Sequence, residues 1–214
     1  GLAADVNTNI TELGRRFAWS IFYEYTRFGV SVDVVAHSMG GLITRAAVTG
    51  IHNPRPGYGS WPPYLYVEDV STLGTPYQGY SICAPGSVQQ CIDMAPSSPF
   101  LNWLAAHPNP AASGVGPDWT LIASGADGFP CCVTSGSALN LNATAHAGHK
   151  ILYHEDEGIE HSDLPSATTG SPEAWYCDYY SSCNMTTVAT WTHVLGYYPP
   201  IAVASFANYY WYLW

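Results

Sequence analysis

Ser38 is the residue whose surroundings most clearly suggest chemistry. It lies in the segment VDVVAHSMGG at residues 32–41, where an apolar run typical of a buried strand is followed by a helix-forming run. A serine on a sharp turn between a strand and a helix is a nucleophile elbow. Such a turn brings the residues two before and two after the serine close together, so both must be small, as Ala36 and Gly40 are. The pattern predicts a nucleophilic Ser38, with alanine in place of the usual first glycine.

A serine hydroxyl is a weak nucleophile at neutral pH, so Ser38 requires a histidine to accept its proton and an acid to orient that histidine. In enzymes with this kind of elbow the three residues follow one another in the order serine, acid, histidine. Asp127 follows the apolar run at 120–123, and His161 lies on a glycine-containing loop after the apolar run at 150–153. We therefore predict that His161 is the general base and that Asp127 orients it.

Other acids and histidines fit these two roles less well. Asp118 precedes its expected strand, and the acids at 155–157 lie too near His161 to form a separate loop. His154 is the main rival for the base, because it also follows the strand expected at 151–153. His37 is expected to point elsewhere, by the geometry of the turn. The remaining histidines are expected to be ordinary surface or core residues: His52, His107, His146, His149 and His193.

The apolar patterns also indicate the elements that position these residues. Apolar residues at helical spacing predict a helix over 6–28, stopped by Gly29, and a second helix over 42–48 is expected to end near Gly50. Strands are expected at 32–35, 64–73, 120–123 and 150–153, with a Pro/Gly-rich loop at 53–63 and a loop or short irregular helix at 132–148. Strands that alternate with helices predict an α/β fold with a mainly parallel sheet. The chain of 214 residues has no interdomain linker and is expected to form one domain, 1–214.

The C-terminal segment 184–214 is unusually apolar and aromatic. Docking of this segment onto the core is the favoured interpretation. An exposed aromatic patch that binds lipid or a partner is the alternative.

The composition limits the partners and the compartment. A formal charge of -10, from six Lys plus Arg against sixteen Asp plus Glu, argues against binding to nucleic acid or to an anionic membrane. A neutral, apolar substrate fits better. Charged residues make up 10% of the chain and aromatic residues 14%, so solubility must depend on Ser, Thr, Asn and the backbone, which suits a secreted, extracellular protein.

The six cysteines favour disulfides over a metal site. We predict the pairs Cys83–Cys91 and Cys177–Cys183, each of which closes a small loop. The adjacent Cys131 and Cys132 form a strained vicinal bridge or stay reduced under this scheme. No C-x-x-C pair is present, and the spacing HAGH at 146–149 lacks a further ligand, so we expect neither a metal nor a cofactor.

Five passages resemble the small extracellular triacylglycerol lipases of bacteria, which belong to the α/β-hydrolase superfamily. The elbow at 32–41 matches, including the alanine of Bacillus-type lipases, and LGTPYQG at 73–79 resembles the L-G-T-P-x-x-G loop of the family. DMAPSSPFL at 93–101 resembles the later M-x-P-x-S-x-F-L segment, and the passages around Asp127 and His161 resemble the acid and histidine loops. The resemblance spans about residues 6–165 and implies an α/β-hydrolase fold and ester hydrolysis; the remaining tail lies outside it.

The oxyanion hole is only half accounted for by this sequence. One donor is the backbone N–H after the nucleophile, that of Met39, and the resemblance implies a second donor from a loop after an earlier strand. Only 37 residues precede Ser38, enough for one long helix and the elbow strand, and no His-Gly pair occurs among them. We hypothesise that the chain is a processed or nicked product whose N-terminal portion, with the missing strands, is lost or supplied by a companion chain.

The leading prediction is a secreted esterase or lipase that forms an acyl-enzyme on Ser38. An acyltransferase or thioesterase with the same triad is an alternative, because only the acceptor differs. A non-catalytic binding or structural module that keeps the fold is the alternative outside enzymes, favoured by the missing oxyanion segment and opposed by the intact Ser38, Asp127 and His161.

Overall fold

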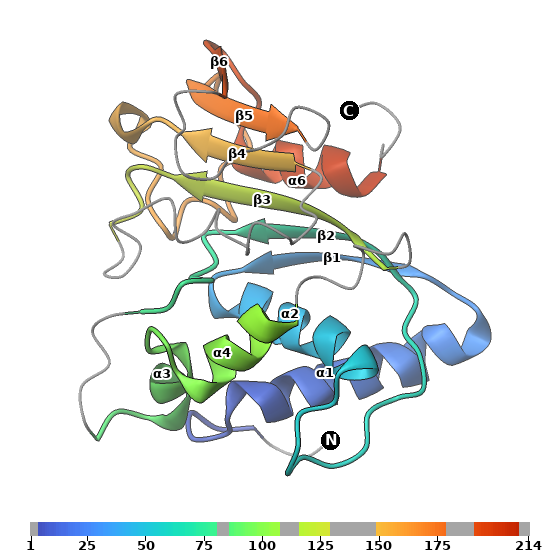
Figure 1. The fold of residues 1–214 in the computed structure, drawn as a ribbon. Helices are drawn as coiled ribbons and strands as arrows, with labels where there is room; N and C mark the ends of the chain where they lie inside the picture. The colour runs from blue at the N-terminus through green and yellow to red at the C-terminus, as the bar shows by residue number, and fades with distance from the viewer. Residues whose placement is uncertain (1–3, 81–85, 108–115, 129–148, 179–190, 210–214) are drawn as a thin grey trace.

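A computed structural model describes residues 4–80, 86–107, 116–128, 149–178 and 191–209. Six strands in these ranges form one sheet in the order β1-β2-β3-β4-β5-β6 (Figure 1). The first four strands are parallel, and β5 and β6 are antiparallel to their neighbours. The strands are β1 (Val32–His37), β2 (Val67–Leu73), β3 (Asp118–Ser124), β4 (His149–Tyr153), β5 (Ala174–Asp178) and β6 (Thr192–Val194). The predicted α/β class with a mainly parallel sheet is confirmed.

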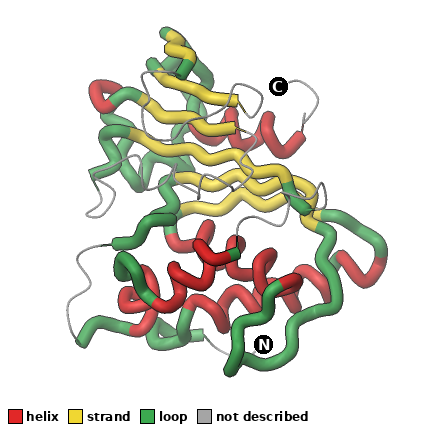
Figure 2. Tube along the Cα trace, in the orientation of Figure 1, coloured by secondary structure: helices red, strands yellow, loops and turns green. Residues whose placement is uncertain are grey.

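Helices cover both faces of this sheet (Figure 2). Successive side chains of a strand point to opposite faces, and β3 shows both. Leu121 packs in one buried cluster with Val48 of α2, whereas Ile122 packs in another with Val203 of α6. The helices are α1 (Ile10–Glu24), η1 (Thr26–Phe28), α2 (Met39–His52), α3 (Gln89–Met94), α4 (Pro99–Ala106), η3 (Glu155–Glu157) and α6 (Pro200–Tyr209). The sheet is therefore buried between layers, as a parallel sheet requires.

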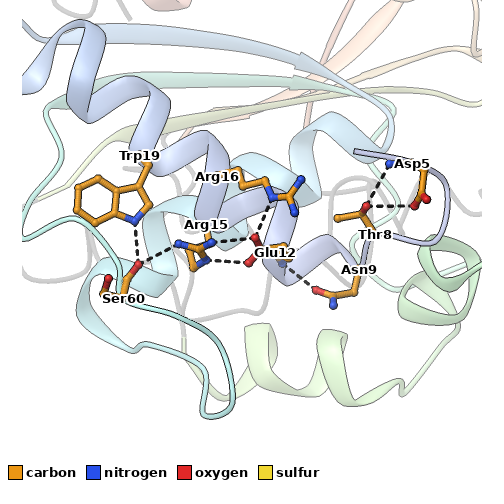
Figure 3. Close-up of polar contacts among 8 residues, drawn as sticks. All are labelled: Asp5, Thr8, Asn9, Glu12, Arg15, Arg16, Trp19 and Ser60. Carbon is orange, nitrogen blue, oxygen red and sulfur yellow. Dashed lines mark hydrogen bonds and ion pairs between the residues drawn. The ribbon is translucent and has the colours of Figure 1, made fainter. Parts of the chain in front are cut away.

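The first helix begins later than the predicted residue 6, because Asn9 caps it. The Asn9 side chain accepts a hydrogen bond from the Glu12 N–H at 2.8 Å (Figure 3). Glu12 then binds Arg15 and Arg16 at 2.7 and 2.8 Å, one turn further along α1. The helix ends at Glu24, and the predicted stop, Gly29, ends the 3-10 turn that follows with φ of 75°.

The second helix continues past Gly50 to His52. The helix thus ends near Gly50, as predicted, and Gly50 itself is a packing site: a β-carbon there would overlap the indole ring of Trp61. The loop 53–63 therefore folds back onto the helix pair. The backbone carbonyl of Ser60 in this loop also accepts the indole N–H of Trp19, from α1, at 2.8 Å (Figure 3).

Part of the C-terminal segment docks on the core as expected. Val203 and Ala204 of α6 are fully buried against Leu73 and Ile151. The hydroxyl of Tyr153 donates to the backbone carbonyl of Tyr198 just before this helix, at 2.6 Å. No helix within the described ranges combines the length and apolar character needed to cross a membrane.

Candidate active site

Ser38 occupies a strained turn between β1 and α2. Its φ of 55° and ψ of −131° are unusual for a residue other than glycine, and such strain concentrates at functional sites. A β-carbon on Gly40 would lie 3.7 Å from that of Ala36. These two positions therefore meet across the turn, and an alanine at 36 fits because its partner has no side chain.

Hydrogen bonds to the neighbouring strand hold this turn in place. The N–H of Ser38 donates to the carbonyl of Leu73, the last residue of β2, at 2.9 Å. The Ser38 carbonyl accepts from the hydroxyl of Thr75 at 2.9 Å and from the N–H of Gly41 at 3.1 Å. Thr75 is 1% exposed, and a side chain on Gly41 would overlap it. The loop after β2 therefore locks the backbone of the nucleophile.

Asp127 and His161 lie together, 34 residues apart in the chain. Nδ1 of His161 and Oδ2 of Asp127 are 2.8 Å apart, so the imidazole N–H donates to the carboxylate. Asp127 is buried at 3% exposure, and the side chain of His161 is 14% exposed. Asp127 reaches this position through a turn after β3, in which its N–H donates to the Ser124 carbonyl at 3.2 Å.

Gly74 places the loop after β2 directly beside this pair. A β-carbon on Gly74 would lie 2.9 Å from Oδ2 of Asp127 and 3.1 Å from Nδ1 of His161. Gly74 is one residue beyond Leu73, whose carbonyl binds the Ser38 N–H. Ser38, Gly74 and Asp127 follow β1, β2 and β3, so the site forms at the carboxyl ends of the parallel strands, where ligands bind in open α/β sheets.

A strained serine between a strand and a helix, followed along the chain by an acid and a histidine that bind each other, is the arrangement of the α/β-hydrolase fold. The described chain has an α/β fold with a mainly parallel sheet, and its site resembles this arrangement.

Comparisons with known proteins give only distant structural likenesses. No family model matches the chain, and no curated protein matches it. Among solved structures, Bacillus licheniformis lipase BlEst2 in its propeptide form aligns with a TM-score of 0.40 and 20% identity over 55% of this chain and 26% of that chain. The mature form of BlEst2 aligns with a TM-score of 0.41 and 21% identity, over 66% of this chain and 61% of that one. Phospholipase PlaB from Legionella pneumophila, solved with thio-NAD, aligns with a TM-score of 0.44 and 16% identity over 69% and 34%.

The chain thus spans less than two thirds of each of these three structures.

His37 lies beside His161, contrary to the expectation that it points elsewhere. Its Nε2 is 2.8 Å from the backbone carbonyl of His161, and the two rings have centroids 4.5 Å apart at a tilt of 43°. Burial lowers the pKa of His37, and the adjacent His161 lowers it further. The expectation was wrong because the base loop packs over the end of β1, and no spacing rule links residues 124 positions apart. Adjacency to Ser38 was the one signal in the sequence.

The rival residues have structural roles in the described chain. His154 caps η3, where its Nδ1 accepts from the Asp156 N–H at 3.1 Å. Asp118 is the first residue of β3, whereas Asp127 follows the other end of this strand. The carboxylate of Asp118 accepts from the Trp119 N–H at 2.9 Å. No cluster of three metal-binding side chains occurs among the described residues, and His146 lies outside them.

Met39 is the first residue of α2, and its N–H points out of the first turn, where no helix carbonyl can accept it. The positive end of the helix dipole lies at the same place, which suits a developing negative charge. Within the described ranges β1 is an edge strand of the sheet, and its Val35 is 47% exposed. The second donor expected for the oxyanion hole comes after an earlier strand, and the described chain contains none before β1.

Cys91 and Cys177 are both disulfide-bonded, and no described cysteine is free. The partners that we predict for them, Cys83 and Cys183, lie outside the described residues, as do Cys131 and Cys132. The pairing therefore stays a prediction.

Proposed function

We propose that the protein is a secreted serine hydrolase that cleaves neutral, apolar carboxylic esters through an acyl-enzyme on Ser38. The observation that carries the proposal is the hydrogen bond of 2.8 Å between His161 and the buried Asp127, together with the elbow geometry of Ser38, whose neighbour His37 contacts the backbone of His161. The carboxylate accepts the proton on Nδ1, so the other ring nitrogen of His161 carries the lone pair that a general base needs.

The reaction follows from these roles. The Ser38 hydroxyl attacks the ester carbonyl while Nε2 of His161 takes its proton, and the Met39 N–H stabilises the oxyanion that forms. His161 then gives the proton to the departing alcohol, which leaves an acyl group on Ser38. Water, deprotonated by His161, releases the acid and restores the serine. Asp127 stays ionised throughout and stabilises the imidazolium.

The second oxyanion donor is the part of the site that needs a further segment. We propose that a strand from a companion chain, or from another segment of a longer chain, pairs with the edge strand β1 and brings a loop with a backbone N–H to the site. The place of β1 at the edge of the described sheet supports this, because an edge strand presents backbone N–H and C=O groups with which another strand can pair. Removing one oxyanion donor costs about 10²–10³-fold in turnover, so this segment matters for activity.

Hydrolysis of a series of p-nitrophenyl esters by the full-length protein tests the proposal. The wild-type protein should hydrolyse neutral acyl esters, Ser38→Ala should lose about 10⁶-fold, and Asp127→Asn about 10⁴-fold. His154→Ala is the matched control, because it removes a histidine just after β4 that caps η3 and packs against Trp175, and it should stay within about twofold of wild type. Equal rates for wild type and Ser38→Ala would refute the proposal.

A further inference from the structure

His37 makes two separate contacts with the residue proposed as the general base. Its ring packs against the imidazole of His161, and its Nε2 meets the backbone carbonyl of the same residue at 2.8 Å. A carbonyl can only accept a hydrogen bond, so Nε2 of His37 carries the proton and donates it. This bond connects the strand that carries the nucleophile to the loop that carries the base.

We infer that His37 is a positioning residue: it fixes the backbone of His161, and therefore the direction of the imidazole, relative to Ser38. The inference rests on the proposed function of the site. It assigns no direct contact between His37 and substrate, so His37 acts through His161.

The other restraints on the base loop explain why this bond matters. Asp127 accepts the hydrogen bond from Nδ1 of His161 and so orients the ring, but the direction of the ring also depends on where the loop holds the backbone of His161. Leu164, fully buried in the core, anchors the loop three residues further on. The contact with His37 holds the carbonyl of His161 itself, which ties the base to the residue next to the nucleophile.

The charge state of His37 suits this role. The charged or titratable groups that act on it are His161 and Asp127. Burial, its main perturbation, keeps the pKa of His37 below the ordinary value of 6.5, so the ring is neutral at neutral pH and adds no positive charge beside the base. A neutral donor is what a residue needs if it is to hold the base without opposing the imidazolium that forms during the reaction.

Three substitutions of His37 separate the effect of its hydrogen bond from the effect of its ring contact with His161. His37→Gln places an amide N–H near the position of Nε2 and keeps the donor. His37→Phe keeps an aromatic ring and removes the donor, and His37→Ala removes both. His154→Phe is the matched control, since that histidine directly follows the parallel strand β4 and also packs against an aromatic ring, that of Trp175, with ring centroids 4.9 Å apart.

We expect His37→Phe and His37→Ala to lower kcat for ester hydrolysis by about 10²-fold with KM changed less than about twofold, since a displacement of about 1 Å costs that much. His37→Gln should recover at least about a tenth of the wild-type kcat, and His154→Phe should match wild type. A purely structural role would instead lower the amount of folded protein without a kcat-specific loss that glutamine rescues.

A second measurement makes the inference testable even if the protein hydrolyses no ester. The proton on Nδ1 of His161, held by Asp127, should give a low-field ¹H resonance in ¹⁵N-histidine-labelled protein, assigned by its loss in Asp127→Ala. This resonance should be sharp in wild type and in His37→Gln, and broadened or absent in His37→Phe and His37→Ala. The same sharp signal in all four proteins, or no such signal in wild type, would overturn the inference. Loss of ester hydrolysis with the predicted resonances intact would refute the proposed function alone.

Discussion

Replacing Gly74 by alanine should disturb the hydrogen bond between Asp127 and His161, although neither of these residues is substituted. The backbone at Gly74 has φ of 57°, a left-handed conformation that costs alanine about 1–2 kcal/mol. The new β-carbon would also lie 2.9 Å from Oδ2 of Asp127 and 2.9 Å from Cδ1 of Leu164. Ordinary van der Waals contact begins near 3.4 Å, so each atom must retreat by about 0.5 Å.

The expected consequences can be scaled from these distances. A displacement of about 1 Å in a catalytic constellation costs about 10²-fold, so about half that displacement should cost roughly tenfold in kcat/KM. The free energy of unfolding should fall by about 2–4 kcal/mol, because strain and displaced packing add to each other. Ester hydrolysis and urea unfolding of the same preparations measure the two effects.

Gly29→Ala is the matched control for this experiment. Gly29 also has a left-handed backbone, with φ of 75°, but a β-carbon there would meet nothing within 4 Å. It should therefore lose about 1–2 kcal/mol of stability with unchanged kcat/KM. If Gly74→Ala matched Gly29→Ala in both stability and activity, the conclusion that Gly74 supports the Asp127–His161 pair would be refuted.

Three further substitutions test other parts of the molecule. Thr75→Val removes the hydroxyl that holds the Ser38 carbonyl and should cost about 1–3 kcal/mol of unfolding free energy as well as lowering kcat, whereas Thr75→Ser should keep both; equal behaviour of the two variants would contradict the role of the bond. Burial and neighbouring carboxylates raise the pKa of Asp69 from 3.8 to about 7, so the folded chain holds this proton more tightly than the unfolded chain, and stability falls as pH rises from about 4 to 7. Asp69→Asn should therefore match wild type at pH 4 and exceed it by about 1–2 kcal/mol at pH 8 in thermal or urea unfolding, after allowance for partial exposure; a gain of the same size at both pH values would show that the carboxyl is not responsible. Tyr153→Phe removes the bond to the Tyr198 carbonyl and should cost about 1–2 kcal/mol with kcat unchanged, and an undiminished unfolding midpoint would show that this bond does not anchor the C-terminal helix.

The parts of the site that could be predicted from the sequence are those whose structure depends on residues close together in the chain. The elbow depends on an apolar strand, a serine and two small residues within ten positions, and Ser38 has the strained backbone that this pattern implies. The four parallel strands were predicted from apolar runs, with ends displaced by at most three residues. Chain order and strand ends then singled out Asp127 and His161, which the structure joins by a hydrogen bond.

The parts that sequence could not predict depend on contacts between distant segments. Nothing local shows that His37 binds the carbonyl of a residue 124 positions away. Nothing in the sequence indicates that Gly50 packs against Trp61, where a β-carbon would overlap the indole ring. Likewise, the sequence does not show why the L-G-T motif lies at 73–75. In the structure, Gly74 leaves room for the side chain of Asp127, and the hydroxyl of Thr75 donates to the carbonyl of Ser38.

Covalent labelling of Ser38 tests the central claim most directly. A fluorophosphonate reacts with a serine that a neighbouring base has activated, and reacts hardly at all with an ordinary serine hydroxyl. The folded full-length protein should be labelled at a single site, mapped by mass spectrometry to the peptide that contains Ser38, and labelling should disappear on denaturation and in His161→Ala. A folded protein that stays unlabelled at Ser38, or one labelled equally well after denaturation, would contradict the account.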